Sequence, residues 1–446
     1  MNNLMNDLYP YFEDLSDRLL AGLNPGEDLS LNIAAEESLF VRFNKNAIRQ
    51  NTNVEQITIS LRLQVNHRSV EKSRSLRGQL REDMKSLTAL LDECRHEAAQ
   101  LPTDPHQVAL ANNGTSREEF RGELLAKEKI VEEILGAANG LDIAGLLGSG
   151  VVIRGNRNSL GQNHWFATES FFLDYSLYNG PKAAKGNYSG AKWNSDAWKK
   201  NLSRTRMQLE MLSKPLQKIP AGKYRSYLAP AAFGDLAGML GWMGLSAAAW
   251  KQGRSPTKKL ANGEAKFSPL FTLSENFSMG LAPRFNSLGE VAPLQSTLIE
   301  KGSWKQFLVS SRSAKEYGLQ ANFAIPEEFP RAIDIAPGTL SEKDILKEIG
   351  TGFYLSNLHY LNWSDPVTAR VTGMTRYACL WVSNGEIAGP IQDLRFDESL
   401  YDALGSKLVA LTDHAEIDPA IGTYVARDLG GKRAPGAIID QFTFTL

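Results

Sequence analysis

The segment from Lys223 to Trp250 constrains the fold most, because it is the longest apolar stretch of the chain (KYRSYLAPAAFGDLAGMLGWMGLSAAAW). Pro230 suits the first turn of a helix, where its missing N–H leaves no bond unmade. The apolar side chains after it cover nearly the whole circumference of such a helix, so we expect burial on all sides. The four glycines within it destabilise a free helix by on the order of 1 kcal/mol each, which indicates that another backbone lies close.

This segment is also long enough to span a membrane, but Asp235 near its middle and the four glycines favour a buried helix of a soluble protein. The N-terminus, MNNLMNDLYPYFEDL, has no basic start and no uninterrupted apolar run, so we expect no signal peptide. Two cysteines, Cys94 and Cys379, are too few for a disulfide framework and fit a reducing compartment. We therefore expect a cytoplasmic protein that does not contact membranes.

Residues 1–115 are predicted to form an N-terminal α+β region. Between Val54 and Val65 the apolar residues alternate strictly, which is typical of a half-buried antiparallel strand. A later apolar stripe at helical spacing predicts a helix that covers the apolar face of the sheet. The predicted elements are a helix at 3–23, strands at 29–34, 38–43 and 54–65, a helix at 76–100 and a linker at 101–115.

Residues 116–218 are predicted to complete the N-terminal domain as a second α+β region. Ser116 and Glu119 have the spacing of a capping box, which predicts a helix that starts there. The predicted elements are this helix at 116–138, strands at 151–154, 164–168 and 170–178, an exposed loop at 179–192 and a charged helix at 195–212.

Residues 219–446 alternate short apolar runs with Gly and Pro turns, which predicts a β-rich C-terminal domain around the buried helix. Two hairpins are expected, at 298–309 and 377–387, and Asn384-Gly385 supplies the positive φ values that the second turn requires. The expected fold class is α+β: an N-terminal antiparallel sheet with covering helices, followed by this β-rich domain.

Two blocks of this C-terminal region carry a family resemblance. The first spans residues 280–319 and begins GLAPRFNSLGEV; the second combines EIGTGFYLSNL (348–358) with VTGMTRYACLWVSNGEIAGPIQDLRF (371–396). Their order and spacing are similar to those of the TldD/PmbA peptidase family, also called modulator of DNA gyrase. The resemblance covers most of residues 222–446, while the N-terminal half matches only loosely.

The resemblance distinguishes two kinds of subunit. The TldD-like kind carries the zinc motif His-Glu-x-x-x-His at the start of the buried helix and a downstream Cys ligand, whereas this chain has Ala229, Pro230 and Gly234 at the motif positions. None of these residues binds a metal, and the segment GGKRAPGAI (430–438) contains no Cys. The chain therefore resembles the PmbA/TldE kind, which implies no metal in this chain and zinc in a TldD-like partner.

The resemblance also implies a function. We expect a non-catalytic subunit that forms a heterodimer with a TldD-like zinc peptidase and helps it to bind and degrade peptides or unfolded segments. Such an extended chain would add as a strand to an exposed sheet edge. Two alternatives remain open: a metallopeptidase that acts alone through ligands the sequence does not identify, and a homodimer that holds peptides without cutting them.

Other candidate sites are few. The six histidines lack the close spacing of a helical zinc motif. The stretch HYLNWSDP (359–366) collects His359, Tyr360, Trp363 and Asp365 in a predicted loop, which would line a peptide cleft or form a packed corner. The net charge is −1 and the basic clusters are short and interrupted by acids, so nucleic-acid binding is not expected.

Overall fold

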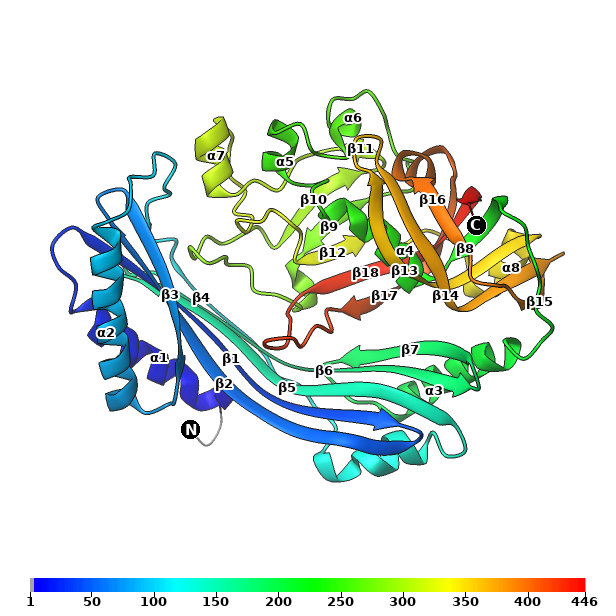
Figure 1. The fold of residues 1–446 in the computed structure, drawn as a ribbon, viewed down its shortest axis with the longest axis horizontal. Coiled ribbons are helices and arrows are strands. Elements are labelled where there is room, and N and C mark those ends of the chain that lie inside the picture. The colour runs from blue at the N-terminus through cyan, green and yellow to red at the C-terminus, as the bar shows by residue number, and fades with distance from the viewer. Residues whose placement is uncertain (1–3, 446) are drawn as a thin grey trace.

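The computed structural model describes residues 4–445, which form two large sheets with helices packed on them (Figure 1). The N-terminal sheet curves into an arc, and the C-terminal part lies within its concave side. Its strand order is β3-β2-β1-β5-β6-β4, with β7 also paired to β6. The strands are β1 (Glu27–Asn44), β2 (Ala47–Val65), β3 (Arg68–Leu76), β4 (Thr115–Phe120), β5 (Asp142–Asn158), β6 (Asn163–Asn179) and β7 (Lys182–Gly190).

Two helices cover one face of this sheet, α1 (Leu4–Leu20) and α2 (Leu80–Ala98). Because β2 alternates, Ile57, Ile59 and Leu61 are all buried on the face that meets α1 and α2. Both predicted helices and the alternating strand are confirmed. A third helix, α3 (Ser195–Met211), contributes Trp198 and Leu202 to a separate core, and Asn194 caps its start by accepting from the N–H of Ala197.

The helix predicted at 116–138 is wrong. Residues Thr115–Phe120 form β4, which pairs in parallel with β6, and Ser116 meets Nδ1 of His164 through its hydroxyl (2.8 Å). Glu119 pairs with Arg117 and does not reach back to Ser116. The backbone of β6 instead bonds the backbone groups of residues 115–120, and helical structure within the predicted range begins only at η1 (Lys127–Lys129) and continues in η2 (Val131–Gly136).

The exposed loop predicted at 179–192 is also wrong, because β7 occupies most of it and pairs antiparallel with β6. Gly186 permits this pairing: a Cβ there would lie 2.3 Å from the ring of Tyr175, which covers it. The three strands predicted between 151 and 178 are two long ones, β5 and β6, joined as a hairpin.

The C-terminal sheet has the order β11-β10-β9-β12-β18-β16-β14-β13-β8. Because β8 also pairs with β18, the strands β18, β16, β14, β13 and β8 form a closed ring of pairings. The strands are β8 (Gly222–Leu228), β9 (Leu273–Asn276), β10 (Gln295–Glu300), β11 (Ser303–Trp304), β12 (Ala332–Ile335), β13 (Gly352–Asp365), β14 (Arg370–Ser383), β15 (Glu386–Pro390), β16 (Arg395–Ser399), β17 (Leu408–Pro419) and β18 (Gly431–Phe444).

Short helices connect these strands. They are α4 (Pro230–Gly238), η3 (Met239–Gly241), α5 (Ala247–Lys251), α6 (Lys258–Ala261), η4 (Phe277–Met279), α7 (Ser311–Tyr317), η5 (Glu342–Asp344), α8 (Ile345–Ile349) and η6 (Asp402–Ser406). Both predicted hairpins are confirmed, and Asn384 and Gly385 have φ values of 52° and 79° in the second.

The central apolar segment is buried but is not one long helix. Phe233 and Leu236 of α4 and Leu240 of η3 are 0 % exposed in the C-terminal core, as expected for a buried helix. The helix ends at Gly238, however, and Met243 turns the chain with a φ of 69° before α5 begins. Trp242 is consequently 50 % exposed, so the expectation of burial on all sides holds for α4 and not for the whole segment.

The fold class is α+β, as predicted: an antiparallel N-terminal sheet with helices and a β-rich C-terminal part. Parallel pairs are the exception, at β4–β6, β12–β18 and β13–β8. Within residues 4–445 no helix has the length and apolar character needed to cross a membrane.

Candidate functional site

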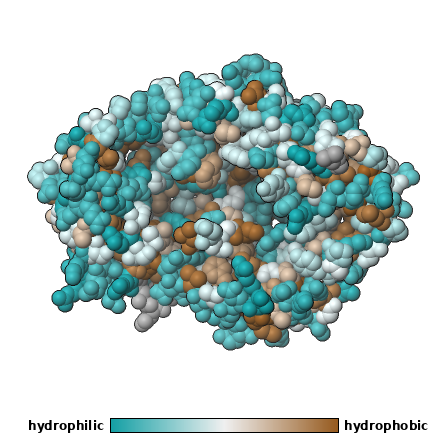
Figure 2. All heavy atoms as spheres, in the orientation of Figure 1, coloured by the Kyte–Doolittle hydropathy of each residue, from teal (hydrophilic) through white to brown (hydrophobic). Residues whose placement is uncertain are grey.

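A cavity of about 910 Å³ lies where the N-terminal sheet meets the C-terminal sheet. Its walls come from β6, β7 and α3 on one side and from β8, the start of α4, β13, β14 and β17 on the other. Figure 2 shows that the surface is hollowed between the arc and the C-terminal part, with hydrophobic residues around the hollow and a largely hydrophilic surface elsewhere.

The connection between β17 and β18 ties the two parts together beside this cavity. Arg427 is 4 % exposed and donates to the carbonyl oxygen of Gly150 and to the hydroxyl of Ser170, both in the N-terminal sheet. Its backbone N–H donates to Glu36. The buried guanidinium is thus held by residues of both β5 and β6, which helps to fix how the two sheets meet beside the cavity.

The three positions that correspond to the zinc motif lie at the start of α4. Ala229 is the residue before the helix and Pro230 is its first residue, and both line the cavity. Gly234 is buried one turn further on. None of these three residues has a side-chain atom that can coordinate a metal, so they cannot form a zinc site. Among residues 4–445, no three His, Cys, Asp or Glu side chains gather into a metal-binding group.

A lysine side chain from β18 occupies the space beside Gly234. A Cβ at position 234 would lie 3.1 Å from Cε of Lys432, so the absence of a side chain makes room for this lysine. The Lys432 ammonium bonds Asp235 of α4 at 2.7 Å and Asp418 of β17 at 3.0 Å. One positive charge thus bridges two carboxylates from different elements, next to the three positions that the resemblance assigns to the zinc motif.

Burial and charge act in opposite directions on this group. Burial alone would lower the pKa of Lys432, but the carboxylates of Asp235 and Asp418 raise it well above its usual range. Burial raises the pKa of Asp235, and the nearby ammonium offsets only part of that rise. Lys432 therefore remains protonated and acts as a fixed positive charge.

The remaining charged groups lie on the same cavity. Lys185 pairs with Asp174 across β7 and β6, and Arg204 of α3 pairs with Glu416 of β17 at 2.6 Å. Glu342 lines the cavity without an ion-pair partner among the residues described. These groups come from both sheets, so the site exists only after the two parts of the chain have assembled.

The predicted peptide-cleft residues do not come together. All four residues belong to β13, which continues to Asp365, and not to the predicted loop. His359 lines the cavity, Tyr360 points to solvent at 82 % exposure, and Trp363 packs against the C-terminal core. Asp365 accepts from Thr368 (2.6 Å) and from the N–H of Val367, which closes the turn between β13 and β14.

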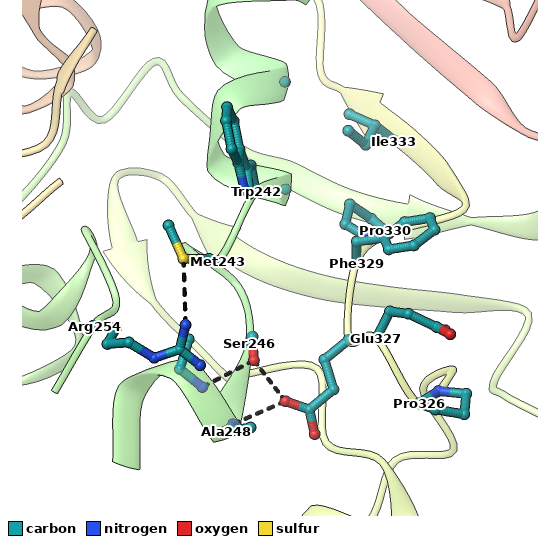
Figure 3. A pocket seen from close by; sticks show the side chains of 14 residues that line it. Trp242, Met243, Ser246, Ala248, Arg254, Pro326, Glu327, Phe329, Pro330 and Ile333 are labelled. Atoms are coloured by element: carbon teal, nitrogen blue, oxygen red, sulfur yellow. Dashed lines mark hydrogen bonds between the residues drawn. The ribbon is translucent and has the colours of Figure 1, made fainter. Parts of the chain in front are cut away.

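A second, smaller cavity of about 630 Å³ lies at the other end of α4 (Figure 3). Trp242, Phe329 and Pro330 form its apolar wall. The carboxylate of Glu328 is buried there and accepts from the hydroxyl of Ser246 at 2.7 Å and the N–H of Ala248 at 2.8 Å. Glu328 therefore has a structural role in this wall.

The family assignment follows from residues 221–446, which match the family described as PmbA/TldA metallopeptidase C-terminal domain. The chain belongs to this TldD/PmbA family. No match was found among curated proteins.

Solved structures share the fold over the whole chain. A protein described as a modulator of DNA gyrase from Thermotoga maritima has a TM-score of 0.77 at 16 % identity, covering 97 % of this chain and 100 % of that one. TldE from Thermococcus kodakarensis has a TM-score of 0.76 at 15 % identity, covering 98 % and 100 %. A protein from Bacteroides thetaiotaomicron with the same description as the first reaches 0.73 at 15 % identity, covering 99 % of each chain.

Several cavity residues were not found from the sequence, above all Lys432, Asp418 and Arg204. One clue was available: Asp235 is the only charge within the apolar part of its segment. A lone carboxylate in an apolar segment indicates a cation partner, but it does not identify which of the basic residues supplies it.

Proposed function

We propose that this chain is a non-catalytic, TldE/PmbA-like subunit of a TldD/TldE-type zinc peptidase. One observation carries the proposal: Ala229, Pro230 and Gly234 replace the motif that would hold the metal, and the ammonium of Lys432 fills the adjoining space. A zinc peptidase needs the metal to activate water and a Glu to transfer the proton. Without either group this chain contributes binding surface, and the partner contributes the chemistry.

The substrate that suits the cavity is an extended peptide or unfolded segment. Two strands that border the cavity each pair with one other strand within residues 4–445: β7 with β6, and β17 with β18. The second edge of β17 is bonded to residues 338–340 only around Leu411–Asp413. Such an edge binds an extended chain through main-chain hydrogen bonds, which give affinity with little sequence selectivity.

The proposed partner is a TldD-like chain, and the proposed compartment is the cytoplasm. Cys94 and Cys379 are both free and buried, which suits a reducing compartment. A permanent pair of subunits commonly buries more than about 2,000 Å². A homodimer that holds peptides without cleaving them is the alternative outcome of the same experiment.

The test measures cleavage of a fluorogenic extended peptide by this chain, by a TldD-like chain with an intact His-Glu-x-x-x-His motif, and by the mixture. We expect this chain alone to be inactive and the mixture to exceed the partner alone, with all activity abolished by a zinc chelator. Chelator-sensitive cleavage by this chain alone, free of contaminating protease, would support the independent metallopeptidase instead. A mixture no more active than the partner would favour the homodimer.

A further inference from the structure

The charged groups on the cavity wall do not balance. Five carboxylates line it against three permanently charged basic groups, so two negative charges are uncompensated when His359 and His414 are neutral. The carboxylates are those of Asp174, Asp235, Glu342, Glu416 and Asp418, and the basic groups are those of Lys185, Arg204 and Lys432. The chain as a whole carries a net charge of −1, so this excess is local to the cavity.

Each basic group is already bound to a carboxylate. Lys185 holds Asp174, Arg204 holds Glu416, and Lys432 is shared between Asp235 and Asp418. The excess therefore has two locations: the pair of carboxylates around Lys432, and Glu342, which has no ion-pair partner within residues 4–445. Two such charges in a partly enclosed cavity attract a cation more strongly than the same charges on an open surface.

A largely buried tyrosine on the same wall has a hydroxyl without a hydrogen-bond partner among the residues described. Tyr227 of β8 is 2 % exposed and lines the cavity, and within the described chain its hydroxyl bonds to nothing, although its ring meets that of Tyr354 at 5.1 Å. Burial raises the pKa of Tyr227, so its hydroxyl remains neutral. The amide oxygen of Asn187 is likewise buried without a partner. Each oxygen has a free lone pair that can accept a hydrogen bond from an N–H group of a bound ligand.

Lys432 already shows how a cation with an aliphatic stem is accommodated in this cavity. The methylenes of Lys432 lie against Gly234 while its ammonium bridges two carboxylates. A second aliphatic stem would pack along the rings of Tyr227 and Tyr354 and present its charge toward Glu342, since long basic side chains bury their stems and aromatic faces attract cations.

We propose that this cavity selects peptides by a positively charged group, the ammonium or guanidinium of a basic side chain, through Glu342 and the hydroxyl of Tyr227. The inference rests on the proposed peptide-binding function and adds a substrate class to it. Peptides with basic side chains bind better than neutral ones, and acidic peptides bind worst. A free amino terminus carries the same chemistry and is the other source of such a group.

The test measures binding of short unstructured peptides of equal length to the full chain by fluorescence anisotropy at low salt. The peptides have blocked termini and differ only in central residues, Lys, Gln or Glu, and a further Gln peptide has a free amino terminus. We expect the Lys peptide to bind about tenfold or more tighter than the Glu peptide, a preference that shrinks as salt is raised. Tighter binding of the free Gln peptide than of its blocked form would assign the site to the amino terminus.

Two variants locate the effect. Glu342→Gln and Tyr227→Phe should each reduce the preference for Lys over Glu, by about tenfold for the loss of the Glu342 charge. Glu82→Gln is the matched control, since Glu82 is exposed in the first turn of α2, outside the cavity lining, and should leave the preference unchanged. Equal binding of all three blocked peptides would overturn the charge selection and leave peptide binding intact. Binding of none of them would overturn the proposed function itself.

Discussion

Leu240→Ala tests whether the central apolar segment forms the core of the C-terminal part. Leu240 lies in η3, just beyond α4, and is 0 % exposed in the largest apolar cluster, together with Phe233 and Leu236. The change removes three carbons, each worth about 0.8 kcal/mol of burial. That loss is about 2.4 kcal/mol, and the cavity left behind raises the total to about 3–5 kcal/mol.

The assay is equilibrium unfolding in urea, followed by tryptophan fluorescence, with the free energy of unfolding compared between variants of equal m value. Leu294→Ala is the matched control, because Leu294 loses the same atoms but is already 52 % exposed. We expect the control to change the free energy of unfolding by no more than about 0.5 kcal/mol.

The outcome separates two views of the segment. A core position loses burial and gains a cavity, whereas a position that faces lipid or a partner loses little in the isolated chain. If Leu240→Ala costs no more than Leu294→Ala, or if the wild-type protein sediments with membranes, the reasoning about this segment is refuted.

The remaining predictions concern two glycines, the metal content and one buried thiol. Gly238→Ala should raise the free energy of unfolding by about 0.4–1 kcal/mol in a urea titration, because Gly238 has φ −59° and a Cβ there meets nothing within 4 Å. Gly145→Ala should lower the free energy of unfolding, since its Cβ would lie 2.5 Å from the carbonyl oxygen of Asp174. Elemental analysis should find no tightly bound zinc, and one zinc per chain retained through gel filtration would contradict the assignment of Ala229, Pro230 and Gly234. Burial raises the pKa of Cys379 from 9.0 to about 11, so the unfolded chain loses this proton at lower pH than the folded chain. The free energy of unfolding should therefore fall as the pH rises from 9 to 11, and it should fall less steeply in Cys379→Ala. An equal dependence on pH in both proteins would argue against a buried neutral thiol.

Patterns that depend on near neighbours were predictable from the sequence. The alternation from Val54 to Val65 identified β2, because one face of that strand is buried and the other is not. The turn at Asn384-Gly385 was equally clear, since few residues adopt positive φ at low cost. The family blocks in 280–319 and 348–396 likewise identified the family to which residues 221–446 belong.

Patterns that depend on partners distant in the sequence could not be predicted from the sequence. Ser116 and Glu119 have the spacing of a helix start, yet β6 offers the same backbone groups a neighbouring strand and this pairing prevails. The segment 179–192 looked like a loop for the same reason: its Gly, Lys and Asn residues form a strand only because β6 lies beside them.

The candidate site shows this division most clearly. The sequence by itself determined what α4 lacks, since the absence of ligands at Ala229, Pro230 and Gly234 is a matter of residue identity. Only the tertiary structure decided what replaces them, because Lys432 lies 197 residues from Asp235 along the chain and 2.7 Å from it in space. Local sequence sets which groups are present, whereas the assembly of the two sheets sets which charges share a cavity and therefore what that cavity can bind.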